Sequence, residues 1–251
     1  MTWVLFDYGN VICQPQPEPD IARLAEAAGC PVAELLPPYW AYRLDYDRAA
    51  LDVTSYWQQV AADLGGSFTE AQIAELSRLD AGSWLHLRPG SVQLVADLAA
   101  AGVRLAVLSN APGDTAQAVA GLPVAAHFEH LMFSCDLKLA KPDPECFRAA
   151  LAVLRAAPAD VIFLDDRPDN VAGAAALGIR SIHFTGPETA RADLARYGVE
   201  PAPKEGAADW TVKGEWGGGC GGSEERATER RGKSAGTSPP EAQGKQRPGF
   251  P

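Results

Sequence analysis

Short apolar runs alternate with helical patterns along most of the chain. Four runs are rich in β-branched and aromatic residues, and polar residues follow the first three directly: 2–6, 103–108, 161–164 and 181–184. A strand that is apolar along its whole length is buried on both faces, as in a parallel sheet. We therefore expect these four runs to be strands of one parallel sheet.

The segments between these runs carry apolar residues at helical spacing. Three helices are predicted on this basis, over 91–101, 144–155 and 171–177. Asp143 followed by Pro144 is typical of a helix start, because Asp caps free backbone N–H groups and proline fits the first turn. Gly102 and Gly178 mark the ends of the first and third helices. Strands that alternate with helices indicate an α/β protein with a doubly wound sheet.

Residues 15–84 interrupt this alternation. Helical spacing without any strand pattern runs through this segment, with helices expected over 21–28, 32–42, 54–64 and 70–79. An insert directly after the first strand would form a helical cap over the carboxyl ends of the strands, where parallel sheets bind ligands. The predicted division is a core of residues 1–14 and 85–200 and a cap of residues 15–84.

Residues 201–251 differ from the rest of the chain in composition. They contain glycine and proline tracts such as 217–219 and 238–240, and apolar residues are sparse. Such a segment cannot bury enough surface to offset the entropy lost on ordering. We expect a disordered tail, in which Trp210 and Trp216 are the only hints of a docking spot.

The overall composition is that of a globular protein with a sizeable core, since 47% of the 251 residues are hydrophobic and 22% are charged. The formal net charge of −10 provides no basic surface for nucleic acid. The best apolar stretch, 92–108, is broken by Asp97 and Arg104, and the first residues lack the features of a signal peptide. Five scattered cysteines without metal-binding spacing indicate reduced thiols. We expect a cytoplasmic protein without nucleic acid or membrane partners.

Polar side chains with complementary chemistry follow the predicted strands. Asp7, Ser109 and the pair Asp165–Asp166 come directly after strands, and Lys141 lies in a loop before a helix. The carboxyl ends of parallel strands meet in one crevice. Carboxylates are hard oxygen ligands for Mg²⁺, whereas a lysine and a hydroxyl suit phosphoryl oxygens. An aspartate in such a site can also act as a nucleophile and form an aspartyl-phosphate.

The order and type of these residues resemble those of a known enzyme family. The segments 6–12 (FDYGNVI), 108–110 (LSN), 141–144 (KPDP) and 163–170 (FLDDRPDN) are similar to the four motifs of the haloacid-dehalogenase-like hydrolase superfamily. The resemblance covers residues 1 to about 190, and the helical insert sits where this family places its small helical cap. It implies a Rossmann-like core and, most often, Mg²⁺-dependent hydrolysis of phosphate monoesters.

The resemblance also implies a nucleophile and a metal site. Asp7 would be the nucleophile and a ligand of Mg²⁺. The backbone carbonyl of Gly9 and the carboxylate of Asp166 would be further ligands of the metal.

The remaining motif residues would act on the phosphoryl group or support the site. Ser109 and the backbone of Asn110 would contact the phosphoryl oxygens, and Lys141 would offset the charge on nucleophile and phosphate. Asp165 would orient Lys141 or a metal-bound water. Asn170 would support these groups, although a polar residue at a helix start explains it equally well.

Gly9 departs from the family pattern. Most phosphatases of this family carry a second aspartate at this position, which protonates the leaving group and then activates water. Loss of such a group typically costs ~10²–10⁴-fold in rate. Members of the Asp-x-Gly-Asn-Val type that resemble this chain include bacterial sugar-phosphate phosphatases, so the glycine does not exclude a phosphatase. A substitute would have to come from the cap, where 45–48 is the densest polar stretch, and we interpret that stretch as a solvated helix face.

Other residues with chemical potential have simpler explanations. The four histidines (His86, His127, His130 and His183) show no spacing that aims them at this site, so we expect surface or packing roles. Four aromatic residues in or near the cap (Trp40, Tyr42, Trp57 and Trp84) would be able to wall a pocket, but core packing of the helices is the favoured interpretation.

Three functions remain open at this point. The first is a Mg²⁺-dependent phosphatase that acts on a small phosphorylated metabolite through an aspartyl-phosphate on Asp7. The second is a 2-haloacid dehalogenase, in which Asp7 attacks carbon without a metal or a general acid. That branch usually replaces the acidic pair that this chain keeps at Asp165–Asp166. The third is a protein that binds a phosphorylated ligand without turnover. The oligomeric state is not predicted.

Overall fold

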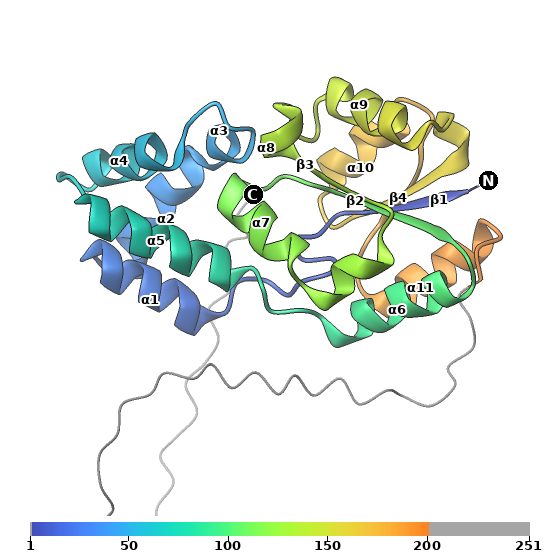
Figure 1. Ribbon diagram of the computed structural model, residues 1–251, viewed down its shortest axis with the longest axis horizontal. Helices are drawn as coiled ribbons and strands as arrows, with labels where there is room; N and C mark the ends of the chain where they lie inside the picture. The colour runs from blue at the N-terminus through green and yellow to red at the C-terminus, as the bar shows by residue number, and fades with distance from the viewer. Residues whose placement is uncertain (1, 201–251) are drawn as a thin grey trace, which may run out of the picture. The chain divides into compact units, whose positions relative to one another are not determined.

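The computed structural model describes residues 2–200, and its centre is a five-stranded parallel sheet (Figure 1). The strands are β1 (Trp3–Phe6), β2 (Arg104–Ser109), β3 (His130–Phe133), β4 (Val161–Asp165) and β5 (Arg180–His183). They lie in the order β3-β2-β1-β4-β5, and all neighbouring pairs are parallel. The chain begins in the middle of the sheet and builds outward on both sides, which is the predicted doubly wound arrangement.

The register of the sheet brings three strand ends to one edge. Phe6 on β1 pairs with Val107 on β2 and with Leu164 on β4. The next residue, Asp7, donates its backbone N–H to the Leu164 carbonyl at 2.8 Å. The last residues of β2 and β4, Ser109 and Asp165, therefore lie at the same edge as Asp7.

Helices cover both faces of the sheet, as the apolar strands predicted. The elements after β1 and the helical insert are α6 (Pro89–Ala100), α7 (Gly113–Ala120), η1 (Pro123–His127), α8 (Ser134–Leu137), α9 (Pro144–Leu154), η2 (Pro158–Asp160), α10 (Pro168–Ala175) and α11 (Pro187–Arg196). Val4 and Phe6 of β1 join a buried cluster with Leu94 of α6, whereas Leu5 packs on the other face with Phe147 of α9. This alternation along a strand confirms the α/β fold.

Five helices separate β1 from α6. They are α1 (Glu18–Ala28), α2 (Val32–Ala41), α3 (Arg43–Asp47), α4 (Val53–Asp63) and α5 (Glu70–Ser83), and no strand lies among them. Their buried side chains form a separate apolar cluster that includes Leu24, Tyr56 and Trp57. Figure 1 shows these helices at the carboxyl end of the sheet, and α5 contacts α7. The division into core and cap at residues 14 and 84 stays a prediction.

The chain enters and leaves this helical segment through two adjacent connections. Cys13 and Leu87 form an antiparallel bridge between them. The backbone N–H of Gln14 donates to the carbonyl of His86 at 2.7 Å, and that of Arg88 donates to the carbonyl of Ile12 at 2.8 Å. The two ends of the insert are therefore joined at the edge where β1 ends.

Helix ends agree with the signals in the sequence, but several elements were not anticipated. The Asp143 side chain accepts a hydrogen bond from the N–H of Glu145 at 2.9 Å. Gly102 and Gly178 have φ values of 74° and 81°, a region that favours glycine. The missed elements are the strand β3, the helices α3, α7, α8 and α11, and the short 3-10 helices η1 and η2. The strand β3 lies at an edge of the sheet and buries only half of its residues, so it lacks the continuous apolar pattern of the inner strands.

Residues 201–251 lie outside the described part of the chain, so the predicted tail with Trp210 and Trp216 is not tested, and neither is Cys220. Between residues 2 and 200, Cys13, Cys30, Cys135 and Cys146 are free thiols, in agreement with the sequence. Within the same range, none of the helices has the length and apolar character needed to cross a bilayer.

Candidate active site

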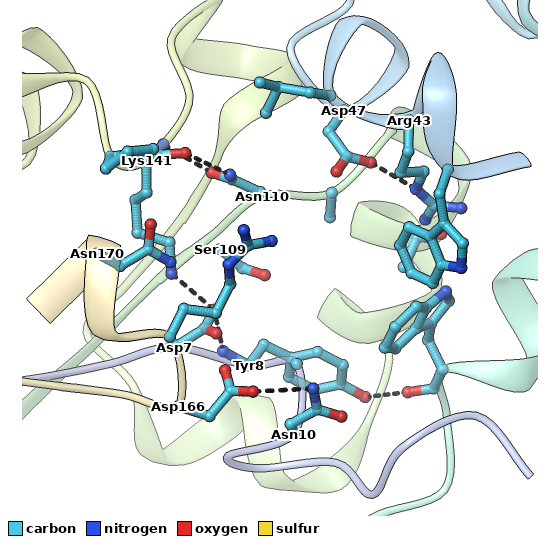
Figure 2. Close-up of a pocket in the computed structure, with 18 residues that line it drawn as sticks. Asp7, Tyr8, Asn10, Arg43, Asp47, Ser109, Asn110, Lys141, Asp166 and Asn170 are labelled. Carbon is cyan, nitrogen blue, oxygen red and sulfur yellow. Dashed lines mark hydrogen bonds and ion pairs between the residues drawn. The ribbon is translucent and has the colours of Figure 1, made fainter. Parts of the chain in front are cut away.

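A cavity of about 370 Å³ lies between the carboxyl ends of the strands and the helices α2 and α3 (Figure 2). The sequence-predicted residues that line it are Asp7, Gly9, Ser109, Asn110, Lys141, Asp166 and Asn170. Asp165 does not line the cavity, but it contacts Lys141 directly. The fold thus brings together residues from four separate sequence motifs.

Lys141 is a buried cation between two carboxylates. Its Nζ atom lies 2.7 Å from Asp7 Oδ1 and 2.8 Å from Asp165 Oδ2, and only 2% of the residue is exposed. Burial favours the neutral amine, but the negative charges of Asp7 and Asp165 outweigh it and raise the pKa of Lys141 above its ordinary value. The ammonium group is therefore held charged at this position.

Asp7 keeps one oxygen available. Its Oδ1 accepts a hydrogen bond from the backbone N–H of Tyr8 at 2.7 Å and contacts Lys141, whereas Oδ2 has no hydrogen-bond partner within residues 2–200. Burial raises the pKa of Asp7 to about 7, and the ion pair with Lys141 opposes this effect. A carboxylate held by one oxygen presents the other to a ligand in the cavity.

Asp165 is fully engaged by the protein. Its Oδ1 accepts hydrogen bonds from the N–H of Arg167 at 2.8 Å and from Asn170 Nδ2 at 3.0 Å. Its Oδ2 accepts from Lys141 Nζ at 2.8 Å and from the same Asn170 nitrogen at 3.0 Å. The Asn170 side chain therefore holds the carboxylate of Asp165 in place, and this carboxylate in turn holds the ammonium group of Lys141.

Asp166 has one oxygen that the described residues leave unsatisfied. Its Oδ2 accepts a hydrogen bond from Asn10 Nδ2 at 2.9 Å, but its Oδ1 is buried and has no partner within residues 2–200. The backbone carbonyl of Asp166 lies 2.9 Å from His183 Nε2. A buried carboxylate oxygen without a partner costs free energy. Asp166 Oδ1 is therefore suited to bind a cation or to accept a hydrogen bond.

Ser109 and Asn110 have different tasks. The side chain of Asn110 makes a reciprocal pair with the backbone of Lys141, in which Nδ2 donates to the carbonyl and Oδ1 accepts from the N–H, both at 2.9 Å. This pair holds the loop that carries Lys141. The Ser109 hydroxyl lines the cavity and has no hydrogen-bond partner in the described part of the chain.

Gly9 faces an aromatic wall. A Cβ atom at this position would lie 3.9 Å from Cζ3 of Trp84, which is ordinary van der Waals contact. Tyr8 donates its hydroxyl to the carbonyl of Trp84 at 2.8 Å and so fixes the position of this wall (Figure 2). The backbone conformation at Gly9 does not require a glycine, since its φ is not positive.

The helical insert contributes Arg43 and Asp47 to the cavity, and both are almost completely buried. Arg43 Nε donates to Asp47 Oδ1 at 2.8 Å, and Nη1 lies 2.8 Å and 3.0 Å from the two carboxylate oxygens of Asp80. Nη1 also donates to the hydroxyl of Tyr39 at 2.6 Å. Burial raises the pKa of Asp47, and the adjacent guanidinium opposes this effect.

The polar stretch 45–48 is therefore not a uniform solvated face, which corrects the interpretation drawn from the sequence. The side chains of Asp45 and Arg48 are each nearly half exposed and form an ion pair with each other at 2.6 Å. Tyr46 is buried and stacks on Tyr56, and Asp47 lines the cavity. The short helix α3 thus has one solvent-exposed face and one face toward the cavity.

The aromatic residues near the cap divide in the same way. Trp40 and Trp84 line the cavity, and 51% of Trp40 is exposed. Trp57 is a core residue, as expected, and Tyr42 donates its hydroxyl to Asp63 at 2.9 Å. Core packing holds for Trp57, and Trp84 packs against the apolar cluster of the sheet in addition to lining the cavity.

Sequence reasoning missed three residues at this site. Arg43 stands four residues before Asp47, and opposite charges at this spacing on a helix are a readable signal. Asn10 lies inside the first motif and contacts Asp166. His183 gave no signal, because only the pairing of β4 with β5 brings it next to Asp166.

The model of the haloacid dehalogenase-like hydrolase family matches residues 1–178. The chain belongs to this hydrolase family. The match spans both the helical insert and the strand ends that form the cavity. The sequence resemblance is therefore confirmed, and the site described above is the candidate active site of a hydrolase.

Curated relatives of this haloacid dehalogenase-like hydrolase include two phosphatases. Phosphoserine phosphatase from Thermus thermophilus is 32% identical over 98 residues, which are 38% of this chain and 39% of that protein. Phosphoglycolate phosphatase from Rhodospirillum rubrum is 31% identical over 133 residues, which are 51% of this chain and 52% of that protein. A match to mouse acyl-CoA dehydrogenase family member 10 is 36% identical but covers only 10% of that protein. The chain thus spans from a tenth to about half of these relatives.

Solved structures share the fold of this family member. A haloacid dehalogenase family enzyme from Bacteroides thetaiotaomicron in complex with magnesium and inorganic phosphate superposes with a TM-score of 0.58 at 19% identity, over 72% of this chain and 93% of that one. L-2-haloacid dehalogenase from Xanthobacter autotrophicus superposes with a TM-score of 0.57 at 22% identity, over 78% of this chain and 83% of that one. At these identities the likeness establishes the fold and not the reaction.

Proposed function

We propose that this protein is a Mg²⁺-dependent phosphatase that hydrolyses a small phosphorylated metabolite through an aspartyl-phosphate on Asp7. The observation that carries the proposal is the pairing of two acids with unengaged oxygens, Asp7 and Asp166, with a buried lysine and a free serine hydroxyl in one cavity. The acids suit a hard divalent cation, and the lysine and the hydroxyl suit a phosphoryl group.

The donor set fits a magnesium ion. Oxygen atoms of Asp7, Asp165 and Asp166 lie within 4.8 Å of one another, and Asp166 Oδ1 is buried without a partner in the described residues. Both oxygens of Asp165 are already engaged, so the ligands of the ion would be Asp7, the Gly9 carbonyl and Asp166. A bound Mg²⁺ would neutralise charge on the phosphoryl oxygens during transfer.

The chain's own residues supply the rest of the chemistry. Asp7 attacks phosphorus with a carboxylate oxygen, the bond to the alcohol oxygen breaks, and water then cleaves the aspartyl-phosphate. Lys141 and Ser109 hydrogen-bond the phosphoryl oxygens, on which negative charge is spread in the transition state. Asp165 and Asn110 act through Lys141: one holds its ammonium group and the other holds its backbone.

Gly9 leaves the leaving group without a dedicated proton donor. A phosphate ester of an acidic alcohol or phenol needs no such donor, whereas an alkyl phosphate does. The proposed enzyme should therefore turn over p-nitrophenyl phosphate much faster than simple alkyl phosphates, unless the substrate itself supplies the proton.

The same contacts argue against the alternative hypothesis of a 2-haloacid dehalogenase. Carbon attack by Asp7 requires no metal ion, so it leaves the free Asp166 oxygen without a role. The likeness to the Xanthobacter dehalogenase concerns the fold. The similar Bacteroides enzyme binds magnesium and inorganic phosphate, which is the ligand pair proposed for this cavity.

The first experiment is p-nitrophenyl phosphate hydrolysis with and without Mg²⁺, for wild type, Asp7→Asn and Asp166→Asn. We expect metal-dependent turnover in wild type and a loss of at least about 10³-fold in Asp7→Asn, because the nucleophile is removed. Asp169→Asn is the matched control, since Asp169 is exposed, belongs to the same motif and does not line the cavity. It should retain full activity.

Two outcomes would contradict the proposal. Metal-independent halide release from 2-chloropropionate would identify a dehalogenase. Absence of turnover with either substrate would favour the third hypothesis, a protein that binds a phosphorylated ligand without turnover.

A further inference from the structure

The cavity has a second end that the proposed phosphoryl chemistry does not use. Figure 2 shows Arg43 and Asp47 opposite the catalytic residues, and Trp40 and Trp84 also line the cavity. The part of a substrate remote from its phosphate would lie against these side chains. Their chemistry therefore bears on which phosphate ester the site accepts.

Asp47 is fixed relative to the catalytic loop. Its backbone carbonyl accepts a hydrogen bond from Ser134 Oγ at 2.6 Å, and the same hydroxyl oxygen accepts from the N–H of Ala111 at 2.9 Å. Ala111 lies two residues after Ser109, and Ser134 is fully buried. One serine thus connects α3 of the helical insert to the loop that would bind the phosphoryl group.

The carboxylate of Asp47 has one oxygen to offer. Oδ1 accepts from Arg43 Nε, whereas Oδ2 has no hydrogen-bond partner within the described range of residues 2–200. The side chain is about nine-tenths buried and lines the cavity, so a ligand group in the cavity that donates a hydrogen bond would satisfy this oxygen.

Arg43, the cation that the helical insert contributes to the cavity, is held in two ion pairs. Arg43 donates to two carboxylates, those of Asp47 and Asp80, so its charge is already compensated within the protein. Arg167 also lines the cavity, but it is exposed and comes from the loop after β4. A carboxylate on the remote part of a substrate would meet the carboxylate of Asp47, which is about nine-tenths buried, and like charges at such a position repel.

We propose that Asp47 determines substrate specificity: its free Oδ2 accepts a hydrogen bond from a hydroxyl group on the remote part of the phosphate ester and excludes a carboxylate there. The inference rests on the proposed phosphatase function and narrows its substrates to uncharged, hydroxyl-bearing phosphate esters. The rings of Trp40 and Trp84 provide apolar surface for the carbon skeleton of such a molecule.

The test compares substrates that differ only at the remote carbon. One pair is glycerol 3-phosphate and 3-phosphoglycerate, and a longer pair is glucitol 6-phosphate and 6-phosphogluconate. Each pair exchanges a hydroxymethyl group for a carboxylate. Wild type should favour the hydroxymethyl member of the pair that reaches Asp47 by at least about tenfold in kcat/KM, because a buried acceptor rejects a group that cannot donate.

Asp47→Asn replaces the free acceptor with an amide of the same shape that is able to donate. We expect the preference for the hydroxymethyl member to fall by at least about tenfold. Asp45→Asn is the matched control, because Asp45 lies on the same helix, does not line the cavity and pairs with Arg48. It should leave the ratio unchanged, and melting temperatures of both variants establish that they are folded.

A binding measurement separates this inference from the proposed function. Isothermal titration of the same four esters into Asp7→Asn, with Mg²⁺ present, reports affinity without turnover, and the double variant Asp7→Asn/Asp47→Asn reports the contribution of Asp47. Absence of p-nitrophenyl phosphate turnover in wild type would reject the proposed phosphatase function. The ratio of affinities would still test the proposed role of Asp47. A preference for the carboxylate member, or a ratio that Asp47→Asn does not change, would overturn the inference and point to Arg167.

Discussion

Gly9 is the position at which this chain departs from most phosphatases of its family. The backbone there has no positive φ, and an added Cβ would be 3.9 Å from Trp84, so the site has room for a side chain. The absence of a proton donor is thus a matter of residue identity and not of steric exclusion. This difference can be reversed by a single substitution.

We predict that Gly9→Asp raises turnover of alkyl phosphates relative to p-nitrophenyl phosphate by ~10²-fold or more, because it restores a group that protonates the leaving alkoxide. The measurement is the ratio of kcat/KM for glycerol 3-phosphate and p-nitrophenyl phosphate. Gly9→Asn is the control, since it adds the same bulk without a transferable proton. Equal behaviour of the two variants would show that proton transfer does not limit the reaction.

At the scale of elements, the helical insert is tied to the sheet through specific polar contacts. Ser134 on α8 connects to α3, and a carboxylate on α1 connects to the return segment before α6. That carboxylate is Asp20, which contacts His86 and Arg23. Burial would raise the pKa of Asp20, but the hydrogen bonds from Arg23 and His86 outweigh it and lower the pKa below its ordinary value.

The lowered pKa gives a prediction for stability. A carboxyl group whose pKa is lower in the folded state stabilises the fold at pH values above its unfolded pKa of about 3.9, and this contribution disappears as the pH falls through the folded value. Asp20→Asn should therefore lower the melting temperature at pH 7 by a few degrees, for a loss of roughly 0.5–1 kcal/mol with exposed partners. At pH 3 and below, the difference from wild type should shrink. Thermal melts of both proteins from pH 7 to pH 2.5 measure it, and a constant difference would refute the linkage.

At the scale of the whole molecule, the five-stranded sheet and the residues that line the cavity all lie within residues 2–200. Deletion of residues 206–251 should leave the melting temperature and the p-nitrophenyl phosphate activity unchanged. The reason is compositional, since apolar residues there are too sparse to contribute a core. Differential scanning fluorimetry of the full chain and the truncated chain provides the comparison. A large fall in melting temperature on truncation would mean that the tail packs on the fold.

Much of the fold was predictable because its central strands are buried on both faces. The four apolar runs correspond to β1, β2, β4 and β5, and Gly102 and Gly178 end the helices that they were expected to end. The edge strand β3 escaped because its outer residues His130 and Leu131 are only half buried and so do not produce an apolar run. Exposure at an edge removes the pattern on which such predictions depend.

The sequence by itself determined the α/β architecture and the identity of the residues gathered at the strand ends. Burial on both faces imposes a continuous apolar pattern on inner strands, and parallel strands deliver the residues after them to one edge. Only the tertiary structure decided which carboxylate oxygens already have hydrogen-bond partners. Both oxygens of Asp165 have partners, whereas Asp166 keeps one without a partner among the described residues. The structure also placed Asp47 in the cavity, from a segment that the sequence suggested was solvated. Such assignments depend on contacts between residues far apart in the chain, and no local pattern encodes them.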